Sequence, residues 1–396
     1  MSEATFSRTK IAILAGARTA TGRYGGQYAS LSTTDLGIAA ARGALQRSAL
    51  APEDVDEVIL GCIGQVGPES YNARAVALGA GLPQTTRAMN VNRLCGSGLQ
   101  AVFSAAQSLA LGINDVVLAG GNESMTSMPY LDYAGHGGPK LSHRKLLNGT
   151  LAMLTDPFSN RHMGTTAENV AEKFGIDRSA QDDFALRSQR RAASERARQV
   201  FAEEIIDQSL LGHSEPERDE HPRPDTTGAS LAALAPAFAA EGTVTAGNSS
   251  GVNDGAAVMA LARLSDARAQ NLPVLATLEH VEVTGYDPAL MGYAPVTAIR
   301  GLLERTGVDL ERVGVIELNE AFAAQALAVI RDAGLDPERV NPYGGAIALG
   351  HPVGATGAIL TLRAAMELAR GDHEYAIVSL CIGGGQGIAA LLRAVH

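Results

Sequence analysis

The sequence predicts an α/β protein built from two similar halves, and three observations carry this prediction. Apolar runs rich in Val, Ile and Leu alternate with amphipathic segments along the chain. Continuous apolar strands between helices are typical of sheets that helices cover on both faces. Segments of the first half recur in the second half in the same order. Because 396 residues also exceed one ordinary hydrophobic core, we expect two packed α/β units related by a pseudo-twofold axis.

The first repeated block pairs residues 42–60 with residues 300–318. Both segments open with Arg-Gly, and further Leu, Arg, Glu and Val residues recur at matching positions about 258 residues apart (300 minus 42). Each copy predicts a helix, a turn marked by Pro or Asp, and a short apolar strand, at 58–60 and at 315–318.

Two further blocks align in the same order. The glycine-rich frame around Cys95 aligns with the frame around His351, and each frame precedes an amphipathic helix. The apolar run 116–120 aligns with the run that ends at Cys381. We therefore expect Cys95 and His351 at equivalent places in the two halves, and we expect both to converge with Cys381 on one pocket.

A segment without a counterpart interrupts the repeat. We assign residues 1–121 and 249–273 to the N-terminal half, residues 274–396 to the C-terminal half, and residues 122–248 to an inserted loop domain. The insertion contains a charged helix predicted over residues 179–201, whose charged face is expected to be solvated. Long insertions are usually functional, so we interpret this one as a lid or a ligand-binding arm.

The composition is that of a folded globular protein, with 46% hydrophobic and 19% charged residues. A net charge of −10 argues against nucleic-acid binding, and it requires a local basic patch or backbone amides for any phosphate-bearing ligand. No run of about 18 uninterrupted apolar residues is present, so no membrane span is predicted. The first six residues lack an apolar signal core, and three cysteines do not form a disulfide framework, so we expect a cytoplasmic protein.

Cys95 and His351 are candidates for nucleophilic chemistry. Cys95 precedes a helix predicted to begin near Gly98, and the unpaired N–H groups of a helix N-terminus favour a thiolate. The alternative for Cys95 is a small buried hydrophobe, as most free cysteines are. His351 lies among glycines that leave space around its ring, so it could serve as a base and as a donor to an oxyanion, although a lone histidine is usually structural.

Cys381 ends an apolar strand and begins a glycine-rich run, where a thiol suits proton transfer to and from carbon. A phosphate-binding loop is the alternative, but the run lacks the Lys-Ser/Thr of a P-loop and the spacing of a dinucleotide fingerprint. Asn319 lies at a strand end that opens a helix, which fits a site residue or a helix cap. Cys62 is interpreted as structural, and no Cys/His spacing indicates a metal site.

These motifs together resemble the thiolase family, which comprises acetyl-CoA acetyltransferases and 3-ketoacyl-CoA thiolases. The matching motifs are Asn-Arg-Leu-Cys-Gly-Ser-Gly around Cys95, Asn-Glu-Ala-Phe-Ala from Asn319, Gly-His-Pro-Val-Gly-Ala-Thr-Gly around His351, and Cys-Ile-Gly-Gly-Gly from Cys381. The resemblance covers essentially the whole chain. It implies a thiolase-like fold, in which two similar α/β halves pack as a layered αβαβα core with an inserted loop domain.

The resemblance also implies roles for the residues of these motifs. Cys95 takes the acyl group from a CoA thioester, His351 activates Cys95, and Cys381 moves the α-proton of the second acetyl-CoA. His351 and a water held by Asn319 stabilise the thioester enolate, and the backbone amides of Cys95 and Gly383 hold the tetrahedral intermediate. Such stabilisation is needed because a carbanion next to a thioester does not form readily in neutral water.

Further matches imply contacts with coenzyme A and the acyl group. His162 and Ser250 are implied at the pantetheine and thioester end, and Arg223 with Ser230 is implied near the adenine. The implied apolar walls of the acyl pocket are Met163, Phe238, Met291 and Phe322.

The implied enzyme is an acetyl-CoA C-acetyltransferase or an acetyl-CoA C-acyltransferase of lipid metabolism. It would condense two acetyl-CoA reversibly to acetoacetyl-CoA and CoA, or cleave 3-ketoacyl-CoA by thiolysis, as a homodimer or homotetramer without a permanently bound cofactor or metal. A longer-chain 3-ketoacyl-CoA thiolase is the alternative activity. A decarboxylating Claisen synthase on the same fold would need no second thiol, and a non-catalytic relative would lack Cys95, His351 or Cys381.

Overall fold

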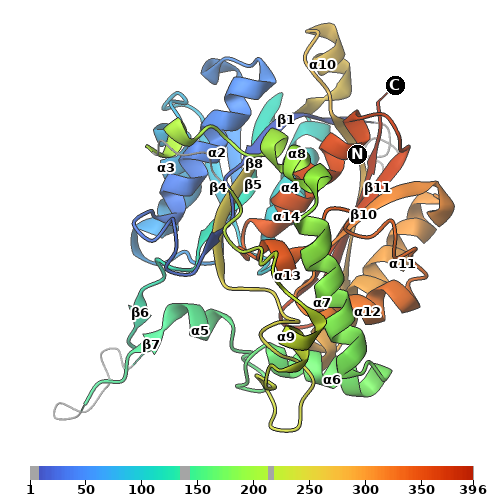
Figure 1. The fold of residues 1–396 in the computed structure, drawn as a ribbon. Helices are drawn as coiled ribbons and strands as arrows, with labels where there is room; N and C mark the ends of the chain where they lie inside the picture. Colours follow the sequence, from blue (N-terminus) through green and yellow to red (C-terminus); the bar gives the residue numbers. More distant parts are fainter. Residues whose placement is uncertain (1–8, 134–142, 213–217, 396) are drawn as a thin grey trace.

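A mixed sheet of ten strands runs through the molecule, and the two repeated parts of the chain each supply one half of it (Figure 1). The computed structural model describes residues 9–133, 143–212 and 218–395. The strands of this sheet are β1 (Ile11–Arg18), β2 (Gly22–Arg23), β3 (Glu57–Gly61), β4 (Arg87–Val91), β5 (Val116–Ser124), β8 (Asn253–Arg263), β9 (Ala276–Gly285), β10 (Val313–Leu318), β11 (Tyr375–Ile382) and β12 (Gln386–Arg393). Their order is β10-β11-β12-β9-β1-β8-β5-β3-β4, and β2 pairs with β8. The halves join where β1 and β9 pair in antiparallel register.

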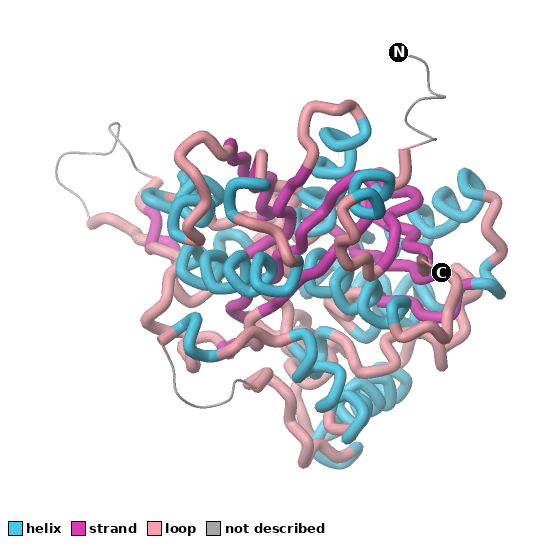
Figure 2. The backbone as a smooth tube through the Cα atoms, turned by 90° about the horizontal axis from the view of Figure 1, so that it is seen from above, coloured by secondary structure: helices cyan, strands magenta, loops and turns pink. Residues whose placement is uncertain are grey.

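Helices form outer layers on both sides of the sheet and a middle layer between its halves. α2 (Thr33–Ser48) and α3 (Asn72–Gly79) pack on the outer face of the N-terminal half, and α11 (Ala294–Thr306) and α12 (Ala323–Asp332) on that of the C-terminal half. α4 (Ser97–Ala110) and α14 (Thr356–Ala369) lie between the halves and pack against each other; α4 touches strands of the N-terminal half, and α14 touches strands of both halves. Figure 2 shows the strands in the middle of the molecule with helices around them. This layering confirms the predicted αβαβα fold.

The strand pairings repeat between the two halves. β3 and β5 are parallel, as are β10 and β11. β5 pairs antiparallel with β8, as β11 does with β12. β8 then pairs antiparallel with β1, as β12 does with β9. The predicted repeat of two α/β units is therefore confirmed in the topology of the sheet.

The register of the repeat differs from the one predicted by the glycine-rich frames. α4 and α14 have the same length and begin 259 residues apart (356 minus 97), and β5 and β11 begin at the same separation (375 minus 116). Cys95 therefore corresponds to Gly354, and Cys381 corresponds to Asn122. The expectation that Cys95 and His351 occupy equivalent places is wrong, because the residue equivalent to Cys95 lies three positions after His351. The glycines of the two frames can be matched in more than one register, which led to the wrong alignment.

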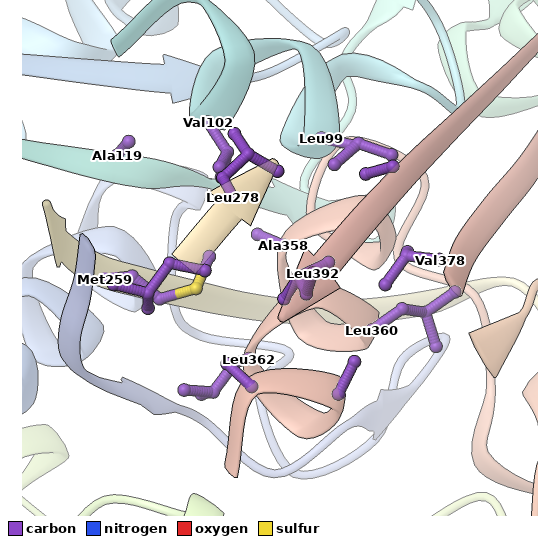
Figure 3. Packing of buried hydrophobic residues seen from close by; sticks show 14 of the residues in the cluster. Leu99, Val102, Ala119, Met259, Leu278, Ala358, Leu360, Leu362, Val378 and Leu392 are labelled. Carbon is purple, nitrogen blue, oxygen red and sulfur yellow. The ribbon is translucent and has the colours of Figure 1, made fainter. Parts of the chain in front are cut away.

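The middle layer forms the largest apolar cluster of the described structure (Figure 3). Leu99 and Val102 from α4 belong to this cluster together with Leu360 and Leu362 from α14. Each such side chain stabilises the fold by roughly 1.5–3 kcal/mol relative to an exposed one. The helix starts also approach closely, since a Cβ on Gly357 would lie 2.4 Å from the backbone nitrogen of Leu99. The segments before α4 and α14 are thus held by a dense, rigid layer.

The insertion leaves the sheet after β5 and returns to it at β8. A small hairpin joins β6 (Tyr130–Leu131) to β7 (Leu147–Asn148). The helices of the insertion are α5 (Gly149–Met153), α6 (Gly164–Phe174), α7 (Arg178–Ala192), α8 (Glu195–Glu204) and α9 (Gly228–Ala232). Two short helices lie outside the insertion, α10 (Leu264–Ala269) and α13 (Ala346–Leu349). Residues 1–6, used above to predict the absence of a signal segment, lie outside the described residues.

The single charged helix predicted over residues 179–201 is wrong, because the chain forms α7 and α8 with a break between them. The Ser194 hydroxyl accepts the N–H of Ala197 at 3.1 Å and so caps α8. α7 also buries Phe184 and Ala185 against the C-terminal half. The segment therefore has a buried face as well as the predicted solvated one.

Buried ion pairs fasten the insertion to the two halves. Arg18 at the end of β1 contacts Glu204 at 2.6 Å and Asp219 at 2.7 Å, and Arg363 on α14 contacts Glu204 at 2.9 Å. These side chains are nearly inaccessible to solvent, so losing one partner would leave a buried charge and cost roughly 3–5 kcal/mol. The pairs hold the end of α8 and the segment from Asp219 against the body of the protein.

Candidate active site

A pocket of about 920 Å³ is lined by residues of both halves and of the insertion. The predicted site residues that line it are Cys95, His351, Cys381, Gly383, His162, Met163, Arg223, Ser230, Phe238, Ser250, Met291 and Phe322. Asn319 does not line the pocket, but its side chain reaches His351. The structure therefore brings the predicted residues together from segments far apart in the sequence.

Cys95 lies in a tight turn immediately before α4. Leu94 has a left-handed backbone with φ of +48°. The Ser97 hydroxyl ties the turn, because it accepts the N–H of Arg93 at 2.8 Å and donates to the carbonyl of Leu94 at 2.6 Å. A bulky residue in this conformation is costly and is found most often at functional sites. The turn presents a half-buried Cys95 side chain to the pocket.

Burial raises the pKa of the Cys95 thiol to about 11, although the N–H groups of Gly383 and of Cys95 itself lower it. At this pKa the resting site holds the thiol and not the thiolate, because burial outweighs the N–H groups that lower the pKa. Cys95 rests as a thiol and needs a base to become a nucleophile. The two N–H groups that point at the sulfur are also close to where an oxyanion on an attached acyl carbon would form.

His351 is held as a neutral imidazole. Burial lowers the pKa of His351 to about 4. Its Nδ1 lies 2.7 Å from the hydroxyl of Thr356, which donates its hydrogen to the carbonyl of Pro352 at 2.9 Å. The hydroxyl must then accept the hydrogen from Nδ1, and this assignment leaves the lone pair on Nε2. His351 can therefore accept a thiol proton through Nε2.

Asn319 lies beside the reactive nitrogen of His351. Its Nδ2 is 3.4 Å from Nε2 of His351, and its Oδ1 is buried without a hydrogen-bond partner among the described residues. The backbone around Asn319 is fixed by Asn341, whose side chain bonds both the N–H and the carbonyl of Leu318 at 2.8 Å. When Nε2 of His351 carries a proton, the amide and the imidazole can both donate to one oxygen atom.

Cys381 lies near the end of β11 and is almost completely buried. Burial raises the pKa of its thiol far above the ordinary value, and negative charge on Cys95 raises it further. Two thiols coupled in this way do not ionise together. The pocket therefore holds at most one thiolate at a time.

The glycine-rich run after Cys381 is a tight turn between β11 and β12. Gly384 and Gly385 both have φ of +81°, and a Cβ on Gly385 would lie 2.4 Å from the carbonyl oxygen of Tyr286. A strand follows the turn, whereas a P-loop would lead into a helix. The phosphate-loop alternative is thus excluded, and the turn instead directs the Gly383 N–H at the Cys95 sulfur.

Aromatic and thioether side chains form one wall of the pocket next to Cys381. His162 stacks on Phe238 with ring centroids 4.9 Å apart, and Phe238 meets Phe322 edge to face at 6.0 Å. Met291 and Phe322 pack in the same cluster as Cys381, and Met163 and Phe238 border it. This wall is apolar and closely packed, so it suits a small apolar acyl group.

Basic side chains lie at another part of the pocket wall. Burial, followed by the charges of Arg223 and Arg23, lowers the pKa of His221 to about 4. Arg223 is exposed, and its N–H is anchored by the side chain of Gln189 at 2.9 Å. Two cations around a neutral imidazole provide the local basic patch that an acidic protein needs to bind a phosphate group.

The two predicted serines differ in how far their hydroxyls are already used. The Ser230 hydroxyl accepts the N–H of Thr227 at 3.0 Å and caps α9, so it has a structural role as well as a place in the pocket wall. Ser250 is anchored through its N–H, which donates to the carbonyl of Ala321 at 2.9 Å. The Ser250 hydroxyl makes no hydrogen bond to the described residues.

Several lining residues escaped the sequence-based reasoning. They share no motif with the glycine-rich frames and reach the pocket only through folding. Examples are Arg23, Ile63, Met125, Leu154 and His221. In a chain of net charge −10, an arginine is a possible sign of a phosphate site. Arg23 could not be selected from the sequence, because it precedes β3 in the chain and comes close to the insertion only in the folded protein.

Residues 9–133, 143–212 and 218–395 contain neither a metal-binding cluster of side chains nor a helix suited to a membrane. No group of three or more His, Cys, Asp and Glu side chains there is arranged to hold a metal ion. No helix of that part of the chain has the length and apolarity needed to cross a membrane.

Two thiols and a neutral imidazole, which two repeated α/β units bring into one pocket, are the groups that an acyltransferase needs. The chain belongs to the thiolase family, because the family models for the thiolase N-terminal domain and the thiolase C-terminal domain match residues 11–265 and 272–394.

Similar proteins extend over nearly the full length of the chain. The beta-ketothiolase BktB of Cupriavidus necator is 44% identical, with 98% of this chain and 99% of that protein covered. An acetyl-CoA acetyltransferase of Pseudomonas aeruginosa is also 44% identical, with 96% and 98% covered. The crystal structure of human mitochondrial 3-ketoacyl-CoA thiolase in complex with CoA has a TM-score of 0.94 at 41% identity, with 98% of each chain covered.

Proposed function

We propose that this thiolase uses Cys95 as its nucleophile, His351 as the base for Cys95, and Cys381 for proton transfer at carbon. The observation that carries the proposal is the meeting of both thiols, the imidazole and the Gly383 amide in one pocket. The reaction is the reversible Claisen condensation of two acetyl-CoA to acetoacetyl-CoA and CoA, or the thiolysis of a 3-ketoacyl-CoA. CoA thioesters are the substrates, as the CoA complex of the human relative also suggests.

Acyl transfer to Cys95 begins with the neutral His351. Nε2 takes the thiol proton as the sulfur attacks the thioester carbonyl carbon, and the carbonyl oxygen becomes an oxyanion. The N–H groups of Cys95 and Gly383 donate to this oxygen. The tetrahedral intermediate then collapses, the CoA thiolate leaves, and the proton on His351 neutralises it.

Proton transfer by Cys381 follows from the coupling between the two thiols. Once Cys95 carries an acyl group, it has no ionisable proton, so the charge that opposed ionisation of Cys381 is gone. Cys381 can then pass its proton to the neutral His351 and, as a thiolate, remove the α-proton of the second acetyl-CoA. The enolate oxygen accepts hydrogen bonds from the protonated Nε2 of His351 and from the Asn319 amide, and the α-carbon attacks the acyl carbon on Cys95 to form the new carbon–carbon bond. The tetrahedral intermediate then collapses, the bond between the acyl carbon and the Cys95 sulfur breaks, and the Cys95 thiolate takes the proton from His351.

We further propose a preference for short acyl groups, with a longer-chain 3-ketoacyl-CoA thiolase as the second candidate. The support is the wall of Met163, Phe238, Met291 and Phe322 beside Cys381. Met163 closes this wall, because a Cβ on Gly383 would lie 3.3 Å from its terminal methyl carbon. The part of the pocket that would hold the acyl group is thus narrow next to the sulfur atoms of Cys95 and Cys381.

A series of 3-ketoacyl-CoA substrates of increasing length tests this preference. Acetoacetyl-CoA should show the highest thiolysis kcat/KM, and Met163→Ala should raise the ratio of six-carbon to four-carbon substrate roughly tenfold, since one methylene changes selectivity by about 10- to 200-fold. Leu111→Ala, at an exposed position outside the pocket, is the control and should leave the ratio unchanged. If acetoacetyl-CoA is far slower than medium or long chains, the longer-chain alternative replaces this proposal.

We also propose that the chain works as a homodimer or homotetramer. β4 is an edge strand with an exposed Met89, and the arm around β6 and β7 exposes Tyr130, Leu146 and Leu151. Exposed apolar side chains at a sheet edge and on a projecting arm are typical of interfaces between chains. Light scattering on the 41.0 kDa chain should therefore report two or four copies per particle at micromolar concentration, and a monomer would contradict the proposal.

A further inference from the structure

Glu123 at the end of β5 is a buried carboxylate that the reaction described above does not use. Its side chain is inaccessible to solvent, and within the described chain no Lys or Arg forms an ion pair with it. A carboxylate in such a place is costly unless its oxygens are well satisfied. The oxygens of Glu123 must therefore be satisfied by hydrogen-bond donors of the surrounding protein.

Backbone N–H groups from both halves of the protein converge on this carboxylate. Oε2 accepts the N–H of Ile63 at 2.9 Å, and Oε1 accepts the N–H of Gly64 at 2.9 Å. Gly354 also packs against the carboxylate, where its N–H lowers the pKa of Glu123. A Cβ on Gly354 would lie 2.4 Å from Oε2, so only glycine allows this approach. Glu123 thus bridges the segment after β3 and the segment before α14 with charge-assisted hydrogen bonds.

The two bridged segments carry the reacting groups. Gly354 comes three residues after His351, and the intervening Val353 lines the pocket. The end of β3, two residues before Ile63, packs against the start of α4, because a Cβ on Gly61 would lie 2.4 Å from the backbone carbon of Ser97, two residues after Cys95. The carboxylate therefore connects the segment that supports Cys95 to the loop that carries His351.

The repeat supplies an internal comparison for this position. The residue equivalent to Glu123 in the C-terminal half is Ile382 (123 plus 259), which packs against Gly96, since a Cβ there would lie 2.6 Å from its Cδ1. An apolar side chain thus suffices to fill this place in one copy of the unit. The carboxylate in the other copy supplies hydrogen bonds and charge that packing alone does not require.

We propose that Glu123 is a positioning residue of the thiolase reaction, which fixes the loop of His351 relative to Cys95 by clamping Ile63, Gly64 and Gly354. The inference rests on the proposed function, because it assumes that Cys95 and His351 react together. Misplacing reacting groups by about 1 Å can cost 10²-fold in rate, so a clamp of this kind has a measurable effect.

The charge of Glu123 gives the clamp a second readout. Burial raises the pKa of Glu123 to about 7, and the N–H groups of Ile63, Gly64 and Gly354 counteract this rise. The charge of Glu123 is in turn one of the causes that raise the pKa of Cys95. The other ionisable groups near it are the Cys62 thiol, at 4.0 Å from Oε1, and Glu69. Removal of the charge should therefore lower the pKa of Cys95.

Glu123→Gln tests the clamp, because it keeps the shape and replaces one acceptor oxygen with a donor that faces an N–H group. The kcat of acetoacetyl-CoA thiolysis should fall about 10- to 100-fold, while KM changes less than about threefold. The pH midpoint for alkylation of Cys95 by iodoacetamide, followed by mass spectrometry of its peptide, should shift to lower pH. Glu53→Gln is the control, because Glu53 is an exposed carboxylate that is not among the groups acting on Glu123 or Cys95, and both readouts should stay at wild-type values.

A folded Glu123→Gln enzyme with wild-type kcat and an unshifted alkylation midpoint would overturn the proposal. If this variant does not fold, Glu123→Asp takes its place, because it keeps the charge and withdraws the oxygens. Its kcat should fall at unchanged KM with the alkylation midpoint near wild type, and an unchanged kcat would equally overturn the proposal. Activity that survives the loss of Cys95 would instead sink the proposed function itself.

Discussion

Replacement of Cys95 by alanine should lower kcat/KM for acetoacetyl-CoA thiolysis roughly 10⁴-fold or more, because removing the nucleophile of a covalent mechanism costs about as much as removing the whole catalytic unit. The second thiol cannot take over, since Cys381 is more deeply buried and its pKa lies further above the ordinary range. The measurement is a single-turnover assay in which the acyl-enzyme is captured by acid quench and located by mass spectrometry.

Binding provides the control for this variant. Loss of the sulfur leaves the basic patch of Arg23 and Arg223 and the aromatic wall untouched, so the affinity for CoA measured by calorimetry should remain within about threefold of wild type. An acyl group found on Cys381 or on another residue of the wild-type enzyme would contradict the assignment of Cys95.

The sequence predicted the fold and most of the site because both depend on local signals. Alternating apolar strands and amphipathic helices report the layers, and the repeated blocks report the topology. The residues of the glycine-rich frames could be identified in the same way, because a tight turn before a helix needs particular residues. Cys95, His351 and Cys381 all lie in the pocket as expected.

The features that were missed depend on distances through space. The break before Ser194 is set by a serine cap that competes with a continuous helix of good helix formers. The pKa of Cys95 follows from the protein packed around the thiol, whereas the sequence displayed only the helix that should lower it. Glu123 carries no motif of its own, and its donors come from segments 59 to 231 residues away (123 minus 64; 354 minus 123).

Replacement of Cys381 by serine should separate the two halves of the reaction. Acyl transfer from a CoA thioester to Cys95 needs only His351 and the two backbone amides, so its rate should stay within about threefold of wild type. Condensation and thiolysis need a proton moved at the α-carbon, and loss of such a general acid–base typically costs 10²–10⁴-fold. A hydroxyl fills the space of the thiol, but its much higher pKa makes it a poor base at this buried position.

Two assays on the same preparation distinguish this outcome from misfolding. Exchange of labelled CoA into acetyl-CoA reports acyl transfer alone, and acetoacetyl-CoA formation reports the complete reaction. Retained exchange with lost condensation assigns the proton transfer to Cys381, because a distorted pocket would slow both assays together. Retained condensation would instead favour a Claisen synthase without a second thiol, and parallel loss of both activities would place Cys381 in the support of the pocket rather than in its chemistry.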